Sequence, residues 1–96
     1  MIRRIRDYPR ELQVGESIYS IRFVRRIPDE PKDTVGLCDD GDKMIWIRLG
    51  QTPRERWKTL THEIAHALEA EYQIKIPHKL IYRLEEPIAR LLEDNL

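Results

Sequence analysis

The residues of this chain with the clearest chemical potential form one pentapeptide, His62-Glu63-Ile64-Ala65-His66. On a helix, two residues four positions apart lie on one face, so both imidazoles can reach the same metal ion. Glu63 lies beside them and can act as a general base on a water molecule held by that ion. This combination is typical of a catalytic zinc site. The spacing therefore predicts His62 and His66 as zinc ligands and Glu63 as the catalytic residue.

The residues around the pentapeptide predict the helix that it needs. Thr52 has the features of an N-cap, Pro53 suits the first helical position, and Glu55 completes a capping box. We expect the helix to end near Tyr72 or Gln73. Apolar residues recur at helical spacing on the side opposite the histidines: Trp57, Leu60, Ile64, Ala67 and Leu68. One face can thus pack on a core while the other presents the histidines to a cleft. The alternative is a surface helix with two solvated histidines.

The third zinc ligand is less clearly marked in the sequence. A catalytic zinc ion usually has three protein ligands and one position open to water. Glu85 shares a helical face with Ile81 and Ile88, and a carboxylate among apolar neighbours needs a partner because burying an unpaired charge is costly. Glu86 falls on a more polar face, and His78 lies near the start of the same helix. We predict Glu85 as the third ligand, while Glu86, His78 or no third protein ligand stay open as alternatives.

The composition bounds the class of protein. Its 96 residues, of which 41% are hydrophobic, predict one small domain over residues 1–96 with a modest core. The 17 basic and 17 acidic residues balance, which disfavours a nucleic-acid partner. We interpret the local basic clusters as solvated surface: Arg3, Arg4, Arg6 and Arg10, then Arg22, Arg25 and Arg26. No apolar run approaches the roughly 18 residues of a membrane span, so no membrane partner is expected.

The single cysteine, Cys38, excludes a disulfide within the chain and fits a reducing compartment. We therefore predict a cytoplasmic protein. Thiolate is a good zinc ligand, but Cys38 is distant from the pentapeptide in sequence, and we interpret it as a small buried residue.

The order of apolar segments predicts an α+β fold. Strand-like segments come first and helix-like segments follow: strands at 18–24, 35–38 and 43–49, and helices at 52–73 and 78–94. This order indicates a small antiparallel sheet of about three strands, packed on the motif helix and on a second, C-terminal helix. Pro87 falls inside the second helix and is expected to kink it. Residues 1–12 carry few structural signals.

Taken together, these segments resemble a very small zincin of the gluzincin type. The similarity is to the minigluzincins and, more loosely, to the ImmA/IrrE-type peptidases of phages and mobile elements. It rests on the segment from Thr59 to Leu68, on the strand from Met44 to Leu49 before it, and on the glutamate-bearing helix from Leu84 to Leu92. The resemblance covers roughly residues 35 to 95. The chain lacks the length for the large subdomain that forms the far wall of the cleft in bigger zincins.

The resemblance implies a zincin-like fold and a set of roles. His62, His66 and a downstream glutamate would hold Zn²⁺, and Glu63 would activate the water. The strand from Met44 to Leu49 would be the sheet edge that lines the cleft and pairs with an extended peptide or protein substrate.

Two functional hypotheses follow from these residues. The first is a zinc metallopeptidase that hydrolyses peptide bonds with Glu63 as general base, with weak or latent activity because the chain is short. Tyr72, Tyr82 and His78 are candidate donors to the oxyanion of such a reaction. The second is a regulatory or interaction module that binds zinc on a zincin scaffold without turnover. A nucleic-acid module, supported by the arginine clusters alone, is a distant third. The sequence does not indicate an oligomeric state.

Overall fold

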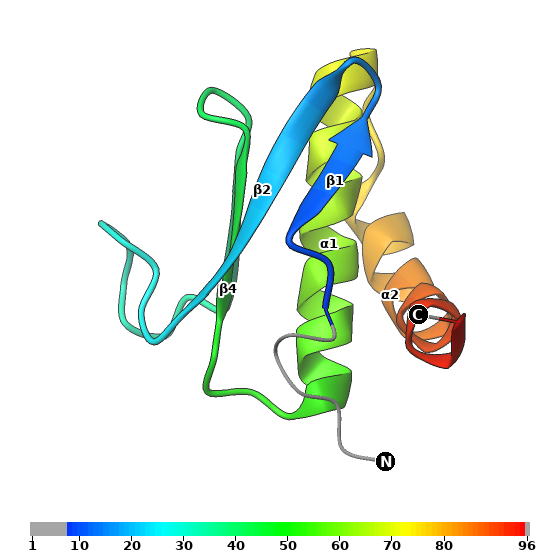
Figure 1. Cartoon of the computed structure of the whole chain (residues 1–96). Helices are drawn as coiled ribbons and strands as arrows, with labels where there is room; N and C mark the ends of the chain where they lie inside the picture. The colour runs from blue at the N-terminus through cyan, green and yellow to red at the C-terminus, as the bar shows by residue number, and fades with distance from the viewer. Residues whose placement is uncertain (1–7, 96) are drawn as a thin grey trace.

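The computed structural model of the protein describes residues 8–95. Within these residues the elements follow in the order β1 (Glu11–Val14), β2 (Ser17–Val24), β3 (Gly36–Asp39), β4 (Met44–Arg48), α1 (Pro53–Tyr72) and α2 (His78–Asn95). Helix α1 packs on the sheet, and α2 packs on the side of α1 that faces away from it (Figure 1). The predicted α+β class is confirmed. The arginines predicted as a basic N-terminal cluster, Arg3, Arg4 and Arg6, lie outside the described residues.

The strands form one mixed sheet in the order β1-β2-β4-β3. β1 pairs antiparallel with β2, β2 pairs parallel with β4, and β4 pairs antiparallel with β3. The prediction of an antiparallel sheet of about three strands is therefore wrong in two respects. β1 adds a fourth strand, which its short and half-polar sequence concealed, and the central pair is parallel.

The prediction that the strand from Met44 to Leu49 forms the sheet edge is also wrong, because β4 lies between β2 and β3. Ile45 and Ile47 of β4 are fully buried. A central position in the sheet favours this burial of apolar surface, which stabilises the fold. The crossover from β2 to the parallel β4 spans residues 25–43, which exceeds the dozen or so residues that parallel pairing needs. That crossover contains β3, which becomes the edge strand on the other side of β4.

The core lies between the sheet and α1. Its largest fully buried side chains are Trp57 and Leu60 from α1 and Tyr19, Ile45 and Ile47 from the strands. At the average worth of burying a large apolar side chain, about 1.5–3 kcal/mol each, these residues account for much of what holds α1 on the sheet. The face of α1 that carries Trp57 is thus committed to the core, as its helical spacing predicts.

Helix α1 begins where the sequence predicts. Thr52 is the N-cap: its hydroxyl oxygen accepts from the backbone N–H of Glu55 at 3.2 Å, and the Glu55 carboxylate accepts from the Thr52 N–H at 2.9 Å. Pro53 is the first helical residue. The helix ends at Tyr72, and Gln73 adopts the left-handed conformation, with φ of 51°.

Helix α2 begins directly after Pro77 and contains Pro87, as predicted. It turns Ile81 and Ala89 toward α1, and both side chains are buried. The facing predicted for its two glutamates is confirmed, since the Glu85 side chain is 13% exposed and that of Glu86 is 55% exposed. Between residues 8 and 95, neither helix is long and apolar enough to cross a membrane.

A polar cluster near the C-terminal end of α1 ties the helix to the sheet. The Glu71 carboxylate accepts from the hydroxyls of Ser17 at 2.6 Å and Tyr19 at 2.7 Å, and it pairs with the Lys43 ammonium at 2.7 Å. These contacts, with the Lys43 hydrogen bond as the largest cause, lower the pKa of Glu71 to about 2. The Glu71 side chain is only 11% exposed, so each contact satisfies a group that has lost most of its water.

Candidate metal centre

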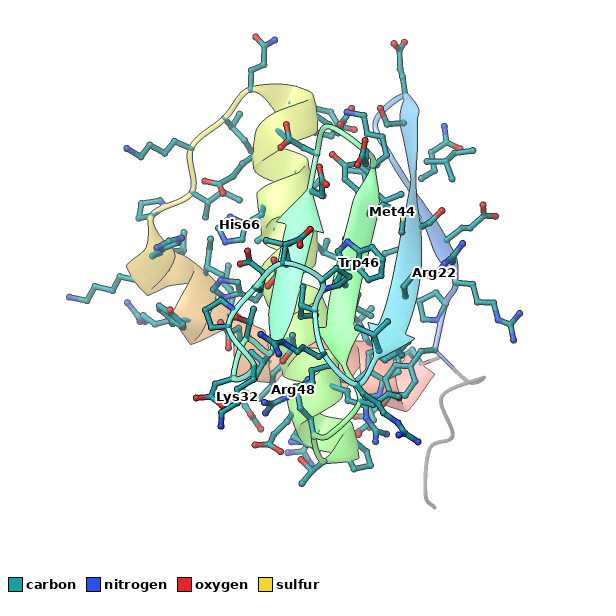
Figure 2. The ribbon with its side chains drawn as sticks, turned by 90° about the vertical axis from the view of Figure 1, so that its left-hand side faces the viewer. Arg22, Lys32, Met44, Trp46, Arg48 and His66 are labelled. Atoms are coloured by element: carbon teal, nitrogen blue, oxygen red, sulfur yellow. The ribbon has the colours of Figure 1, made fainter. Side chains whose placement is uncertain are left out.

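The two histidines of the pentapeptide project from the middle of α1 and meet. Their Nε2 atoms are 3.1 Å apart, and their ring centroids are 4.8 Å apart. His66 projects from α1 on the side where the edge strand β3 lies and where the chain passes to α2 (Figure 2). The helical spacing of four residues thus brings two imidazole nitrogens to a single point, as predicted.

A carboxylate oxygen lies within hydrogen-bond distance of the Nδ1 atom of each ring. His62 Nδ1 lies 2.7 Å from Glu85 Oε2, and His66 Nδ1 lies 2.8 Å from Glu69 Oε1. The hydrogen bond from the Ile76 backbone, followed by that from His66, lowers the pKa of Glu69. An ionised carboxylate only accepts hydrogen bonds, so the proton of each ring belongs on Nδ1. Both Nε2 atoms then carry free lone pairs.

A third imidazole completes the group. Among the described residues, the side chains of His62, His66 and His78 each offer a ligand atom, and these atoms lie within 4.8 Å of one another. The His78 ring centroid is 5.2 Å from that of His66 and 5.9 Å from that of His62. His78 is the first residue of α2, so the connector between the helices determines where its ring lies.

The donor set fits a metal cation. Two Nε2 lone pairs that face each other at 3.1 Å repel one another unless a proton or a cation lies between them. Histidine ligands in metal sites almost always donate their second ring N–H to a carboxylate, a carbonyl or water, which is the arrangement that Glu85 and Glu69 provide. The residues present therefore match the requirements of a zinc-type site with nitrogen ligands.

Glu63 is buried against the edge strand of the sheet. Its exposure is 7%, and a Cβ atom added to Gly36 of β3 would lie 2.9 Å from Glu63 Oε2. Burial raises the pKa of Glu63 to about 7; the charge of His66 opposes this rise and that of Glu85 adds to it. A carboxyl group whose pKa lies near neutrality can both take up and release a proton under physiological conditions.

His62, Glu63 and Glu85 line one groove at the sheet edge. It has a volume of about 300 Å³, and its lining includes Thr34, Val35, Gly36, Thr59, His62, Glu63, Tyr82 and Glu85. The Tyr82 ring lies 5.4 Å from the ring of His62 and is 62% exposed. The groove thus combines an imidazole, a buried carboxyl group and a phenol next to an edge strand.

The geometry agrees with what comparison with known protein families finds. The model of the IrrE N-terminal-like domain, Peptidase M78, matches residues 21–91. The chain belongs to this family. No curated protein and no solved structure is significantly similar to it. Membership of Peptidase M78 points to a metallopeptidase-like function, and it supports the ImmA/IrrE side of the predicted resemblance.

Most of the elements that form the site fall inside the Peptidase M78 match. It includes β3, β4, the whole of α1 and the first part of α2, and hence all three histidines, Glu63 and Glu85. Glu86 lies outside the site, where its carboxylate pairs with Arg54 at 2.7 Å and Lys58 at 3.7 Å on the surface.

Two other residues considered from the sequence are accounted for. Cys38 contacts the core and is absent from the candidate metal-binding group found among the described residues. Burial, followed by the charges of Glu63 and Asp40, raises the pKa of its thiol to about 12, so the thiolate form that binds zinc is disfavoured. Tyr72 lies near Gly15 at the other end of α1 and is no donor to this groove.

Two residues of the candidate site, Glu69 and Gly36, are not predicted from the sequence. Glu69 had a usable signal, since it lies three residues after His66 and so shares its helical face. Gly36 had none, because its closeness to Glu63 depends on β3 being the edge strand next to α1. A glycine in a strand is by itself only a weak indication of a close approach.

Proposed function

We propose that this chain is a zinc-dependent peptidase in which His62 and His66 hold the metal and Glu63 transfers the proton. The observation that carries the proposal is that the two Nε2 atoms meet at 3.1 Å in the same part of the fold as a buried carboxyl group. Zinc supplies Lewis-acid chemistry at such a site: it polarises carbonyl oxygens and lowers the pKa of water from about 15.7 to about 7.

Glu63 is suited to the proton transfers of peptide hydrolysis. With a pKa of about 7, its carboxylate can accept the proton of the attacking water, and its carboxylic acid can donate that proton to the leaving amine. The hydroxyl of Tyr82, an exposed residue that lines the groove, is the candidate donor to the developing oxyanion. No zinc contact by Glu63 is required for either step.

The edge strand β3 can align an extended substrate. The N–H of Arg48 donates to the carbonyl of Val35, so alternation along the antiparallel pair turns the backbone groups of Gly36 and Cys38 away from β4. Within the described chain no further strand pairs with that edge. A peptide that adds a strand here would pass directly beside Glu63. The edge strand that pairs with an extended substrate would therefore be β3, and not the strand from Met44 to Leu49.

For the third ligand we propose His78, with Glu85 holding the His62 ring in place. His78 offers a nitrogen to the group, whereas the Glu85 carboxylate is engaged with His62 Nδ1. The prediction of Glu85 as a direct ligand stays a prediction, and two variants separate the possibilities. If His78 is the ligand, His78→Ala weakens zinc binding far more than Glu85→Gln, whose amide oxygen can still accept from His62. If Glu85 is the ligand, the order reverses.

Peptide-library cleavage tests the function itself, with zinc content measured for every protein. Glu63→Gln should retain zinc and lose about 10²–10⁴-fold in turnover, which is the usual worth of general acid–base help. Glu86→Gln is the matched control, because it removes one exposed carboxylate outside the site. Undiminished cleavage by zinc-loaded Glu63→Gln would refute the mechanism. No cleavage by a zinc-loaded parent would favour a zinc-binding module without turnover. A cytoplasmic location stays a prediction from the sequence.

A further inference from the structure

Glu69 lies in the last turn of α1 and organises the exit from that helix. Its backbone carbonyl accepts from the N–H of Gln73, the left-handed C-cap, and from the N–H of Ile74 at 3.2 Å. The chain therefore folds back over Glu69 as it leaves α1. This brings the connector, residues 73–77, close to the Glu69 side chain.

The Glu69 side chain joins two parts of the site with its two oxygens. Oε1 accepts from His66 Nδ1 at 2.8 Å, and Oε2 accepts from the backbone N–H of Ile76 at 2.8 Å. The side chain is 21% exposed, so both bonds are partly shielded from water. One carboxylate thus fixes a ring on α1 and a backbone group in the connector at the same time.

The connector leads directly into the third imidazole. His78 follows Ile76 by two residues and begins α2, and its ring lies 5.2 Å from that of His66. Pro77, between them, restricts the backbone on both sides of itself. The position of the Ile76 N–H therefore determines where the chain enters α2, and hence where the His78 ring lies.

We propose that Glu69 is a positioning residue of the metal centre, which fixes the orientation of His66 and the position of His78 together. The proposal rests on the proposed function only in naming the metal as the ligand that the two rings await. It assigns Glu69 no contact with metal or substrate. The two donors reach different oxygens of Glu69, His66 Nδ1 at Oε1 and the Ile76 N–H at Oε2. A glutamine places an NH₂ donor at one of these two positions, so in the same side-chain position it can accept only one of the two hydrogen bonds.

Zinc affinity provides the first test, measured by competition with a chromogenic chelator. Loss of a carboxylate that orients a metal-binding histidine typically costs 10–100-fold in metal affinity. We expect a loss of about that size for Glu69→Ala and a smaller loss for Glu69→Gln. The control is Glu86→Gln, which should bind zinc like the parent because Glu86 faces Arg54 and Lys58 on the surface.

Two readouts on the metal-free protein separate positioning from general destabilisation. Nitrogen-15 shifts of the His66 ring should show the Nδ1–H tautomer in the parent and a mixture of tautomers in Glu69→Ala. Hydrogen exchange at the Ile76 amide should be slow in the parent and faster in that variant, while amides in the middle of α1 stay protected. Glu69→Gln keeps the size of the side chain and serves as the second variant if Glu69→Ala unfolds.

The inference is overturned if the Glu69 variants match Glu86→Gln in tautomer and in exchange at Ile76. A parent that binds no zinc would instead refute the proposed function. In that case the two metal-free readouts alone decide whether Glu69 holds His66 and the connector together.

Discussion

Gly36 marks the closest approach of the edge strand to the motif helix, and replacing it with alanine tests the geometry of the site. The added Cβ would lie 2.5 Å from Thr59 Cγ2 and 2.9 Å from Glu63 Oε2. Both neighbours resist displacement: Thr59 is β-branched, buried and hydrogen-bonded to Gln51 at 2.8 Å, and Glu63 is buried. We therefore expect β3 to move away from α1 by a substantial fraction of an ångström.

The size of the effect follows from the cost of overpacking. Extra atoms forced into a well-packed site typically cost about 1–3 kcal/mol. In a domain of this size each kcal/mol lowers Tm by about 4–8 °C. A reduction in the entropy of the unfolded chain offsets about 0.4–1 kcal/mol of this cost for any glycine-to-alanine change.

Thermal unfolding followed by circular dichroism measures the effect, and Gly50→Ala is the matched control. Apart from Gly50 itself and its two chain neighbours, no residue has an atom within 4 Å of a Cβ added at Gly50, so that variant carries the unfolded-state benefit alone. We expect Gly36→Ala to melt at least about 4 °C below Gly50→Ala. Thr59→Ser removes Cγ2 and keeps the hydroxyl, so adding it should relieve part of the clash. Equal Tm values for Gly36→Ala and Gly50→Ala would refute the close approach of β3 to α1.

Three further predictions test two other contacts of the fold and one residue of the candidate metal site. Because the folded pKa of Glu71 is depressed to about 2 from 4.5, the stability it contributes is present above about pH 4.5 and lost as the pH falls through about 2. Thermal melts across that range should therefore show a steeper acid loss in the parent than in Glu71→Gln. Thr52→Ala should lower the free energy of unfolding by about 1 kcal/mol through loss of the N-cap, measured by urea unfolding. Thr34→Ala is the control, because it makes the same substitution at a threonine that is not an N-cap. Glu85→Ala should weaken zinc binding more than Glu86→Ala whether Glu85 binds zinc or orients His62, and equal losses would contradict both roles.

The parts of the fold that were predicted correctly depend on local signals. The capping box at Thr52 and the apolar stripe of α1 are written within one turn or a few turns of helix, so they can be recognised without knowledge of the tertiary structure. The errors concern the sheet. β1 has four residues of mixed polarity, and it becomes a strand by pairing with β2 across a tight turn at Gly15, where φ is 63°. Whether β4 is central or at the edge depends on which strands it pairs with after the crossover from β2, and no local sequence pattern indicates this.

In the candidate site, too, the features that depend on local spacing could be predicted and those that depend on tertiary structure could not. His62, Glu63 and His66 could be identified because one helix fixes their relative positions. The helical spacing of α2 also separated Glu85 from Glu86 correctly. It could not tell whether Glu85 points at a metal or at the back of His62. That distinction depends on the rotation of α2 relative to α1, which is a tertiary quantity.

In the proposed mechanism, two non-local contacts determine whether the pentapeptide can work as a catalytic site. The approach of β3 at Gly36 buries Glu63, and that burial is the main cause that raises its pKa to about 7. The second contact is the set of hydrogen bonds made by Glu69 and Glu85. They orient the two imidazoles through their Nδ1 atoms and, through the Ile76 N–H, hold the connector that leads into α2. In the proposed mechanism the first contact would affect proton transfer and the second would affect metal binding, so the two can fail separately. Gly36→Ala should therefore impair turnover while zinc binding persists, and Glu69→Ala should weaken zinc binding while Glu63 stays buried. If either variant affected both properties equally, the two contacts would not be independent, and β3, α1 and α2 would have to move as one unit.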